Sequence, residues 1–416
     1  MTHRANIEVA DPTSVLFGTT EGIETPQLYI NGQRIPCPFD AEPSTGINGP
    51  APNVPRWLTT STRLLHEGQV VALPTETVYG LAANALAPAA VARIYQTKNR
   101  PADNPLIVHV ASLAMLRSLL PGGEIPAVYE PLIRRHWPGP LTLLFPASPT
   151  VPAIVTCGLP TVAVRFPAHP VARAAIAYSG LPLAAPSANS SGKPSPTLAL
   201  HVWDDLEGRV PLILDSGQCA WGIESTVVDG LRQPPAILRP GGVTLEQIRR
   251  VPGFEACQVY RKNFTDARLE QAPTTPGMKY RHYSPDAQVV LFERRTDDTD
   301  PAAEQDSALT EALRAALARH PGDPVGILTV YPRPASWQTQ VGGATPAQIH
   351  FRAMADEGPT SDPTAAPYTK NLFRSFREFD KLRVRWILVE GSAETHEGLA
   401  LMNRLQKAAS TVVLYP

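Results

Sequence analysis

Cysteine is scarce in this chain of 416 residues, which contains four in all. None forms a Cys-x-x-Cys pair, and no histidine stands at a spacing typical of zinc ligands, so we expect neither a disulfide framework nor a structural metal. Free thiols are typical of proteins in a reducing compartment. The four cysteines are Cys37, Cys157, Cys219 and Cys257.

The net charge is also close to zero, because 37 Lys and Arg residues nearly balance 38 Asp and Glu residues and leave a formal charge of −1. Such a balance gives no global field that would attract nucleic acid or an anionic membrane, so any anion site must be local. The apolar runs are too short to span a bilayer. Residues 1–11 contain no apolar signal core. We therefore predict a cytoplasmic protein.

The common nucleotide-binding and hydrolase motifs are missing as well. The chain contains no G-x-x-x-x-G-K-[ST], no G-x-G-x-x-G, no HExxH and no GxSxG. If a domain of this chain handles a nucleotide, it must use another scaffold.

Proline, by contrast, is abundant, with 45 residues, and we expect long uninterrupted helices to be uncommon in the first two thirds of the chain. Residues 1–55 predict an irregular extension with one strand-like run, Gln27–Ile30. Residues 56–251 alternate short apolar runs with amphipathic segments, which predicts an α/β domain with a large twisted sheet. Predicted strands are 70–74, 106–110, 141–145, 161–166, 183–186, 212–215, 225–229 and 236–239, and predicted helices are 58–67, 88–98, 112–120, 126–136, 168–179, 197–206 and 244–250.

A second domain is predicted after a connecting segment, 252–285. From residue 286 to residue 416 a new alternation of strands and helices is typical of a small Rossmann-like α/β domain. No internal repeat is found. Its predicted strands are 289–292, 325–329, 386–389 and 411–414, and its predicted helices are 306–319, 364–380 and 397–408.

The loop from Lys98 to Leu106 combines two cations with two side-chain amides, directly before the apolar run 106–110. Two prolines stiffen it by fixing φ. Cationic groups held by a stiff loop at a strand edge suit a polyanion such as a nucleoside triphosphate. A solvated basic loop remains the alternative at this point.

Further polar side chains gather where the predicted strands begin or end. In open α/β sheets, ligands usually bind in a crevice at strand ends. Hydroxyl groups orient a triphosphate or an amino-acid carboxylate there, and arginine pairs with it bidentately. Thr161 and Arg165 share one face of their strand, because side chains alternate with period two. The other polar groups are Thr75–Thr77, Ser187–Ser195, Ser225–Thr226 and Arg239.

Each of these features also has a purely structural interpretation. Arg165 inside a strand suits pairing with a structural carboxylate. His109, in an apolar strand, would be a core histidine whose hydrogen bonds are satisfied. Glu76 would lie in a partly exposed turn, and residues 187–195 would form an ordinary loop.

A set of short motifs between residues 57 and 250 resembles, in order and spacing, the YrdC-type fold. Residues 276–285, 371–373 and 402–409 resemble the tail of the long, two-domain threonylcarbamoyl-AMP synthases. The first 55 residues depart from the usual compact start of that family. The motifs are Pro74–Leu81, Lys98–Pro101, Asn104–Ile107, Trp137–Thr142, Val164–Pro167, Ala185–Asn189, Ser191–Gly192, Ser225–Val227 and Arg239–Gly241.

The resemblance implies a reaction in which L-threonine, bicarbonate and ATP give threonylcarbamoyl-AMP, pyrophosphate and water. The product would feed N6-threonylcarbamoyladenosine formation in tRNAs that read ANN codons, with partner proteins performing the transfer. Such a reaction needs positioning and charge neutralisation more than covalent help. Mg²⁺ would bridge the phosphates of ATP and rely on substrate oxygens.

The resemblance also implies the site residues. Lys98 and Arg100 would be catalytic. A segment from Lys279 to Tyr283 would fold over the site as a lid that excludes water. The L-threonine site would contain Thr77, His109, Arg165, the Ala185 backbone and Ser225, and the ATP site would contain Arg100, Asn104, Thr161, Ser187, Ser195, Arg239 and Tyr280.

Two rival functions are open, one of them also enzymatic and the other of a different class. Hydrogenase maturation also uses a YrdC-like module for carbamoyl transfer, but together with zinc-finger cysteine pairs that this chain lacks. An RNA-binding module is the second rival, and the balanced net charge argues against it as the primary role.

Overall fold

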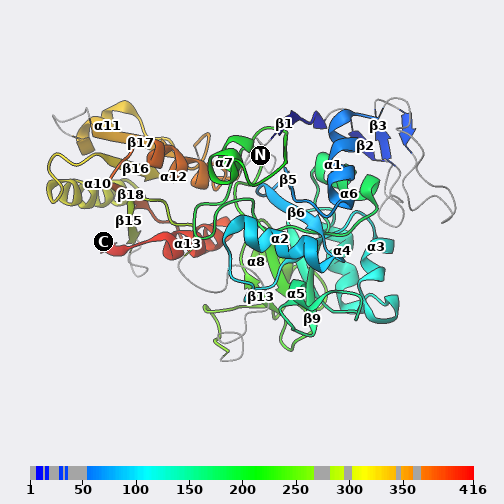
Figure 1. Ribbon diagram of the computed structural model, residues 1–416. Helices are drawn as coiled ribbons and strands as arrows, with labels where there is room; N and C mark the ends of the chain where they lie inside the picture. Colours follow the sequence, from blue (N-terminus) through cyan, green and yellow to red (C-terminus); the bar gives the residue numbers. More distant parts are fainter. Residues whose placement is uncertain are drawn as a thin grey trace. The chain divides into compact units, whose positions relative to one another are not determined.

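The computed structural model describes residues 6–12, 15–17, 28–30, 33–35, 54–266, 282–294, 302–342, 348–358 and 367–416. The chain divides into two units (Figure 1). The first comprises residues 1–191, 195–219 and 224–279, and the second comprises 192–194, 220–223 and 280–416. In the described ranges, no helix combines the length and the apolar character that crossing a bilayer requires.

The first unit is built on a mixed sheet of eleven strands, which confirms the predicted α/β class. Parallel and antiparallel neighbours alternate irregularly along it, with β5 antiparallel to β6 and β7 parallel to β9. The order is β1 (Asn6–Val9), β11 (Leu212–Asp215), β5 (Val71–Leu73), β6 (Gly80–Asn84), β10 (Leu183–Ala184), β7 (Ile107–His109), β9 (Thr161–Arg165), β8 (Leu141–Pro146), β12 (Thr226–Asp229), β13 (Ala236–Arg239) and β14 (Gln258–Val259).

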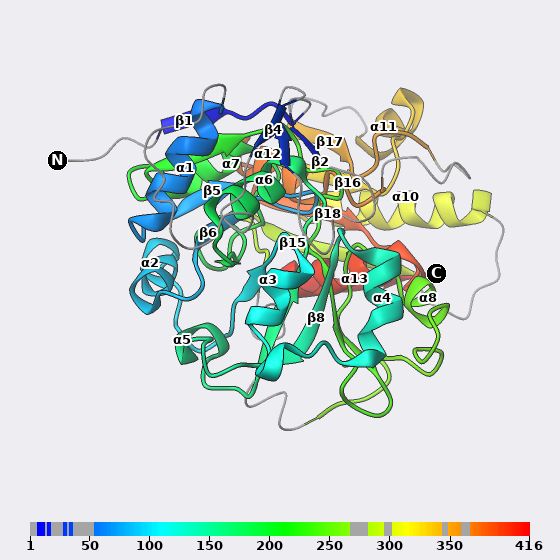
Figure 2. The same cartoon turned by 90° about the vertical axis from the view of Figure 1, so that its right-hand side faces the viewer.

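Short helices surround this sheet, and two pairs of them, α1 with α6 and α2 with α5, lie side by side (Figures 1 and 2). Helix α2 starts at Pro88, as predicted, because a proline at the first helical position is preorganised for the helix. It ends at Lys98, because Asn99 adopts a left-handed conformation with φ 51°. The helices are α1 (Arg56–His66), α2 (Pro88–Lys98), α3 (Leu113–Ser118), α4 (Glu130–His136), α5 (Ala153–Thr156), α6 (Pro170–Ser179), α7 (Ala199–Leu206) and α8 (Leu245–Arg249).

The register of the central strands aligns polar residues on one face. His109 on β7 lies opposite Arg165 on β9, and Arg165 lies opposite Thr142 on β8. Residues directly opposite each other in neighbouring strands point to the same side of a sheet. The sheet therefore gathers a histidine, an arginine and a threonine into one row.

Several elements of the first unit differ from the sequence-based expectation. Strand β6 was not predicted, because Gly80–Asn84 has none of the β-branched residues that favour strands; it forms because β5 and β10 flank it on both sides. The extension before residue 56 is not wholly irregular, since β1 joins the sheet beside β11. A small separate sheet contains β2 (Val15–Phe17), β3 (Leu28–Ile30) and β4 (Gln33–Ile35).

The second unit contains a five-stranded, all-parallel sheet, which confirms the predicted small α/β domain. One buried cluster combines Phe292 of β15 with Leu309 of α10 and Trp337 of α11, so both helices cover the same face. The strand order is β17 (Ile349–Ala353), β16 (Val325–Thr329), β18 (Trp386–Glu390), β15 (Gln288–Arg294) and β19 (Thr411–Tyr415), and the helices are α10 (Ala302–Ala318), α11 (Ala335–Gly342), α12 (Leu372–Lys381) and α13 (Glu397–Ala408).

The expected helix 364–380 is wrong in its start, because α12 begins at Leu372 after a turn at residues 368–371. Strand β17 and helix α11 were not predicted. The predicted division into an extension, 56–251, 252–285 and 286–416 stays a prediction.

A tyrosine hydroxyl fixes the core of the first unit at β8. The Tyr129 hydroxyl donates to the Leu144 carbonyl at 2.6 Å and accepts from the Gly230 amide at 2.9 Å. The residue is fully buried, and burial raises the pKa of its hydroxyl.

Replacing Tyr129 with phenylalanine should lower the free energy of unfolding of the first unit by about 1–3 kcal/mol, because a buried carbonyl and a buried amide lose their partner. Urea denaturation followed by circular dichroism measures this change. The matched control is Tyr331→Phe in the second unit, whose effect should stay within about 0.5 kcal/mol. Equal midpoints for Tyr129→Phe and the parent protein would contradict the prediction.

Candidate functional site

Arg165 lies at the centre of the candidate site, at the end of β9. Its side chain is 3% exposed. Nη1 donates to Thr77 Oγ1 at 2.7 Å, and Nε donates to the Gly139 carbonyl at 3.3 Å. Nη2 lies 2.7 Å from Glu76 Oε1 in a buried ion pair. The strand thus delivers the guanidinium directly to the segment that follows β5.

Glu76 is not the partly exposed turn residue that its sequence context allowed. It is 8% exposed and pairs with Arg165, so the structural interpretation of Arg165 holds in part. Burial alone would raise the pKa of Glu76, but the Arg165 guanidinium more than offsets this and leaves the pKa lowered. The Glu76 carboxylate therefore stays ionised around neutral pH.

His109 stands beside Arg165 in the sheet register and is 5% exposed. Burial, together with the nearby Arg165 charge, lowers its pKa to about 3. Its Nδ1 is buried and has no hydrogen-bond partner among the described residues. The imidazole is therefore neutral at physiological pH, with one nitrogen unpartnered.

Ser225 and Arg239 continue the row on the far side of Arg165. Thr142 Oγ1 and Ser225 Oγ lie 2.8 Å apart. Arg239 donates through Nε and Nη2 to the Ser225 carbonyl, at 3.2 and 2.9 Å, and through Nη2 to the Ser225 hydroxyl at 3.1 Å. One residue predicted for ATP is thus bonded to one predicted for threonine.

Lys98 connects helix α2 to the loop after β10. Its ammonium is buried and donates to the carbonyls of Ser187 and of Asn189, the latter at 2.5 Å. Ser187 in turn forms an isolated antiparallel bridge with Gly80. The loop that carries the predicted serine is therefore held from two sides.

Arg100 and Asn104 lie together, because Arg100 Nη2 donates to the Asn104 carbonyl at 3.0 Å. The guanidinium also lies over the Tyr95 ring, 5.9 Å from its centroid. Asn104 Oδ1 is buried without a hydrogen-bond partner in the described part of the chain. The Arg100 guanidinium is therefore anchored to the main chain of its own loop, while residues 99 and 101–103 are exposed.

The remaining predicted residues are placed less centrally. Ser195 is buried and donates to Glu224 Oε1 at 2.5 Å. The Ala185 amide donates to the Ile107 carbonyl at 3.0 Å, which holds this residue in place. Thr161 begins β9, four residues before Arg165, so the two are separated by roughly 13 Å along the strand. Lys279 and Tyr280 lie outside the described residues.

Three participating residues were given no binding or catalytic role from the sequence. Thr142 and Asn189 stand inside motifs quoted for the resemblance, and Glu224 directly precedes the Ser225–Val227 motif; nothing local marks Glu224 as buried. In the described ranges, no three His, Cys, Asp or Glu side chains come close enough to hold a metal ion.

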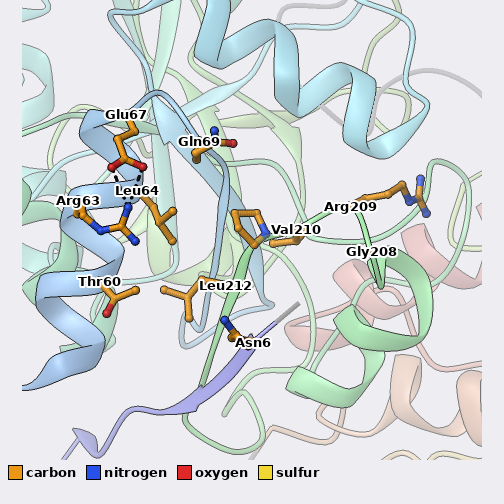
Figure 3. A pocket seen from close by; sticks show the side chains of 11 residues that line it. Asn6, Thr60, Arg63, Leu64, Glu67, Gln69, Gly208, Arg209, Val210 and Leu212 are labelled. Atoms are coloured by element: carbon orange, nitrogen blue, oxygen red, sulfur yellow. Dashed lines mark hydrogen bonds and ion pairs between the residues drawn. The ribbon is translucent and has the colours of Figure 1, made fainter. Parts of the chain in front are cut away.

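A hollow of about 440 Å³ lies elsewhere in the first unit, between the end of α1 and the start of β11 (Figure 3). Arg63 and Glu67 form an ion pair beside it, and the Arg209 side chain is directed away from that pair. None of the predicted site residues lines this hollow.

Comparison with known proteins gives two family matches that together run from residue 63 to residue 410. The family described as "Telomere recombination" matches residues 63–241, and the family described as "Threonylcarbamoyl-AMP synthase, C-terminal domain" matches residues 243–410.

Curated relatives match this chain over most of its length. A threonylcarbamoyl-AMP synthase of Schizosaccharomyces pombe is 47% identical over 82% of this chain and 85% of the relative, and one of Pyrococcus abyssi is 44% identical over 83% and 92%. The crystal structure of P. abyssi Sua5 complexed with L-threonine has a TM-score of 0.72 and 41% identity, and the match covers 86% of this chain and 95% of that one. The chain therefore belongs to the threonylcarbamoyl-AMP synthase family, in the long form that carries a YrdC-type domain and the family's own C-terminal domain.

Proposed function

We propose that this chain catalyses the formation of threonylcarbamoyl-AMP and pyrophosphate from L-threonine, bicarbonate and ATP. The observation that carries this proposal is the buried Arg165, held between Thr77 and Glu76 in a row of polar groups that continues to Ser225 and Arg239. A relative of 41% identity was solved with L-threonine bound, which supports an amino-acid substrate.

The arginine has donors left for a carboxylate. A guanidinium carries five N–H groups, and three of those of Arg165 face Thr77, Gly139 and Glu76. The second N–H groups of Nη1 and Nη2 would then serve the carboxylate of L-threonine. Thr77, Ser225 and the Ala185 backbone would orient the rest of the amino acid.

His109 would contribute as a neutral acceptor. Its Nδ1 is buried and unpartnered in the described part of the protein, and its lowered pKa keeps it uncharged. A neutral imidazole beside Arg165 can accept a hydrogen bond from the amine or hydroxyl of threonine without repelling an ammonium group.

The ATP site would extend away from this row along the strands. Thr161 and Arg165 are separated by roughly 13 Å along β9, which leaves room for an extended nucleotide beside an amino acid. Arg100 and Asn104 would hold the nucleotide together with Ser187, Ser195 and Arg239. Tyr280 is also proposed for this site on the family resemblance alone.

Mg²⁺ would arrive with ATP and neutralise charge on the phosphates. Mg²⁺ prefers oxygen ligands and usually keeps substrate phosphates and water among them. On the protein side, Asn104 Oδ1 is a buried oxygen without a hydrogen-bond partner in the described residues, next to Arg100. It is the kind of ligand that fits this ion.

The chemistry then needs little covalent participation by the protein. The threonine amine and bicarbonate condense to a carbamate with loss of water, and a carbamate oxygen attacks the α-phosphorus of ATP while pyrophosphate leaves. Lys98 and Arg100 would stabilise the negative charge of the phosphates, and Arg165 would hold the attacking carbamate by its carboxylate end. The product would serve tRNA threonylcarbamoylation by partner proteins, in the cytoplasm.

The test of this function is pyrophosphate release from Mg-ATP, with L-threonine and bicarbonate present together or omitted singly. We expect release only when both are present, with threonylcarbamoyl-AMP detected by rapid chromatography. ATP turnover that is indifferent to threonine would overturn the proposal.

A second prediction separates the two substrates. Arg165→Lys retains a charge for Glu76 but loses the fork, so the KM for threonine should rise by about tenfold or more while the KM for ATP stays within about twofold. Arg100→Lys should do the reverse. Each variant serves as the control for the other in steady-state kinetics, and thermal melting checks folding. A rise of both KM values together in both variants would refute the assignment.

A third prediction concerns pH. The pKa of His109 is about 3 in the folded protein and ordinarily 6.5, so below pH 6.5 the unfolded chain binds a proton that the folded protein does not. This term therefore lowers stability as the pH falls from 6.5 toward 3, by up to about 1.4 kcal/mol per pH unit.

His109→Gln removes this term, so the loss of unfolding free energy between pH 7 and pH 5 should be smaller than in the parent protein. Urea denaturation at pH 7, 6 and 5 measures it, with the value at pH 7 as the reference of each protein. An identical pH dependence would show that the imidazole does not stay neutral in the fold.

A further inference from the structure

Arg209 lies in the turn between α7 and β11 and is not among the residues that family resemblance places at the site. Arg209 is an exposed residue, but both terminal nitrogens of its guanidinium donate hydrogen bonds. Nη1 donates to the Thr97 carbonyl at 2.7 Å, and Nη2 donates to the Ser190 hydroxyl at 3.1 Å and to the Asp205 carbonyl. One exposed arginine therefore joins three separate stretches of chain.

Two of these three contacts are adjacent in sequence to groups of the proposed site. Thr97 directly precedes Lys98, and Ser190 directly follows Asn189. Lys98 and Asn189 are themselves joined, because the Lys98 ammonium donates to the Asn189 carbonyl at 2.5 Å. Arg209 thus holds from outside the same two segments that Lys98 joins from inside.

Asp205, at the end of α7, completes this arrangement. Its Oδ2 accepts from the Ser190 amide at 3.2 Å, and its carbonyl accepts from the Ser190 hydroxyl at 3.3 Å. The next residue of the loop, Ser191, donates through its amide to the Lys98 carbonyl at 3.1 Å. The end of α2, the 187–191 loop and the end of α7 therefore form one hydrogen-bonded bracket.

The geometry of the bracket favours arginine over other cations. The acceptors are two main-chain carbonyls and one hydroxyl in different directions, and a planar guanidinium with five N–H groups serves them at once. A lysine ammonium in the same place lacks that rigid fork. The Arg209 side chain is directed away from the Arg63–Glu67 ion pair of the nearby hollow (Figure 3), so the bracket is independent of that pair.

We propose that Arg209 is a positioning residue for the phosphate-side groups of the site: by fixing Thr97 and Ser190, it sets the place of Lys98 and Asn189. The proposal rests on the proposed function for its catalytic consequence, but not for the bracket itself. Of the proposed threonine-side groups, Arg165 lies on β9 and Thr77 in the 75–77 segment, so these two should not depend on the bracket.

The kinetic test compares Arg209→Ala with Arg63→Ala, an exposed arginine of the same region that forms an ion pair with Glu67. Arg209→Ala should lower kcat by about tenfold, within the hundredfold that a misplacement of about 1 Å can cost. The KM for threonine should stay within about twofold. Arg209→Lys should recover part of the loss, and Arg63→Ala should match the parent enzyme.

The structural test uses amide hydrogen exchange of the substrate-free protein and needs no activity. In Arg209→Ala, the amides of Ser190 and Ser191 should exchange at least about tenfold faster, because local opening becomes easier. Peptides that cover β9 should be unchanged, as should all peptides of Arg63→Ala. Equal melting temperatures exclude global unfolding as the cause.

The outcomes separate the two proposals. A parent protein without threonine-dependent turnover refutes the proposed function, and exchange alone then decides whether the bracket exists. Unchanged exchange at Ser190 and Ser191 overturns the bracket. Faster exchange with unchanged kcat in an active enzyme overturns its positioning role, and so does an equal rise of the KM for threonine.

Discussion

The buried ion pair between Arg165 and Glu76 is the constraint on which the rest of the site depends. Removing either charge from water costs several kcal/mol, and a single buried partner left behind is strongly destabilising. Strand β9 and the segment after β5 must therefore keep their relative position. Thr77 is fixed by the same guanidinium, and Thr142 by the register of β8 with β9. The proposed carboxylate-binding fork would thus be a by-product of a structural requirement.

The other cations of the first unit are anchored in a different way. Lys98, Arg239 and Arg209 donate to main-chain carbonyls, which carry only partial charge. These contacts fix the position of each cation. In a chain with a net charge of −1, cations fixed in this way would give the local positive potential that the proposed triphosphate site needs.

The sequence predicted those elements whose signals are local. Helix α2 matches in both ends, because Pro88 starts it and Asn99 can adopt the left-handed conformation that stops it. Strand β6 was missed, because it exists only through its neighbours in the sheet. Glu76 was misjudged for the same reason: its partner Arg165 is distant in sequence, so no local pattern reveals its burial. Family motifs supplied the candidate residues, while Arg209 and Asp205, which complete the bracket around Ser190, lie outside every motif.

Positioning in this site is achieved by main chain as much as by side chains. A reaction that gains its rate from the alignment of a carbamate oxygen with an α-phosphate tolerates little movement of either group. Side chains on loops would provide that precision only if the loops were fixed. The 187–191 loop meets this need, since Gly80, Lys98, Asp205 and Arg209 each bond to it. In the proposed function, the sheet would therefore hold the amino acid and the bracketed loop would hold the nucleotide.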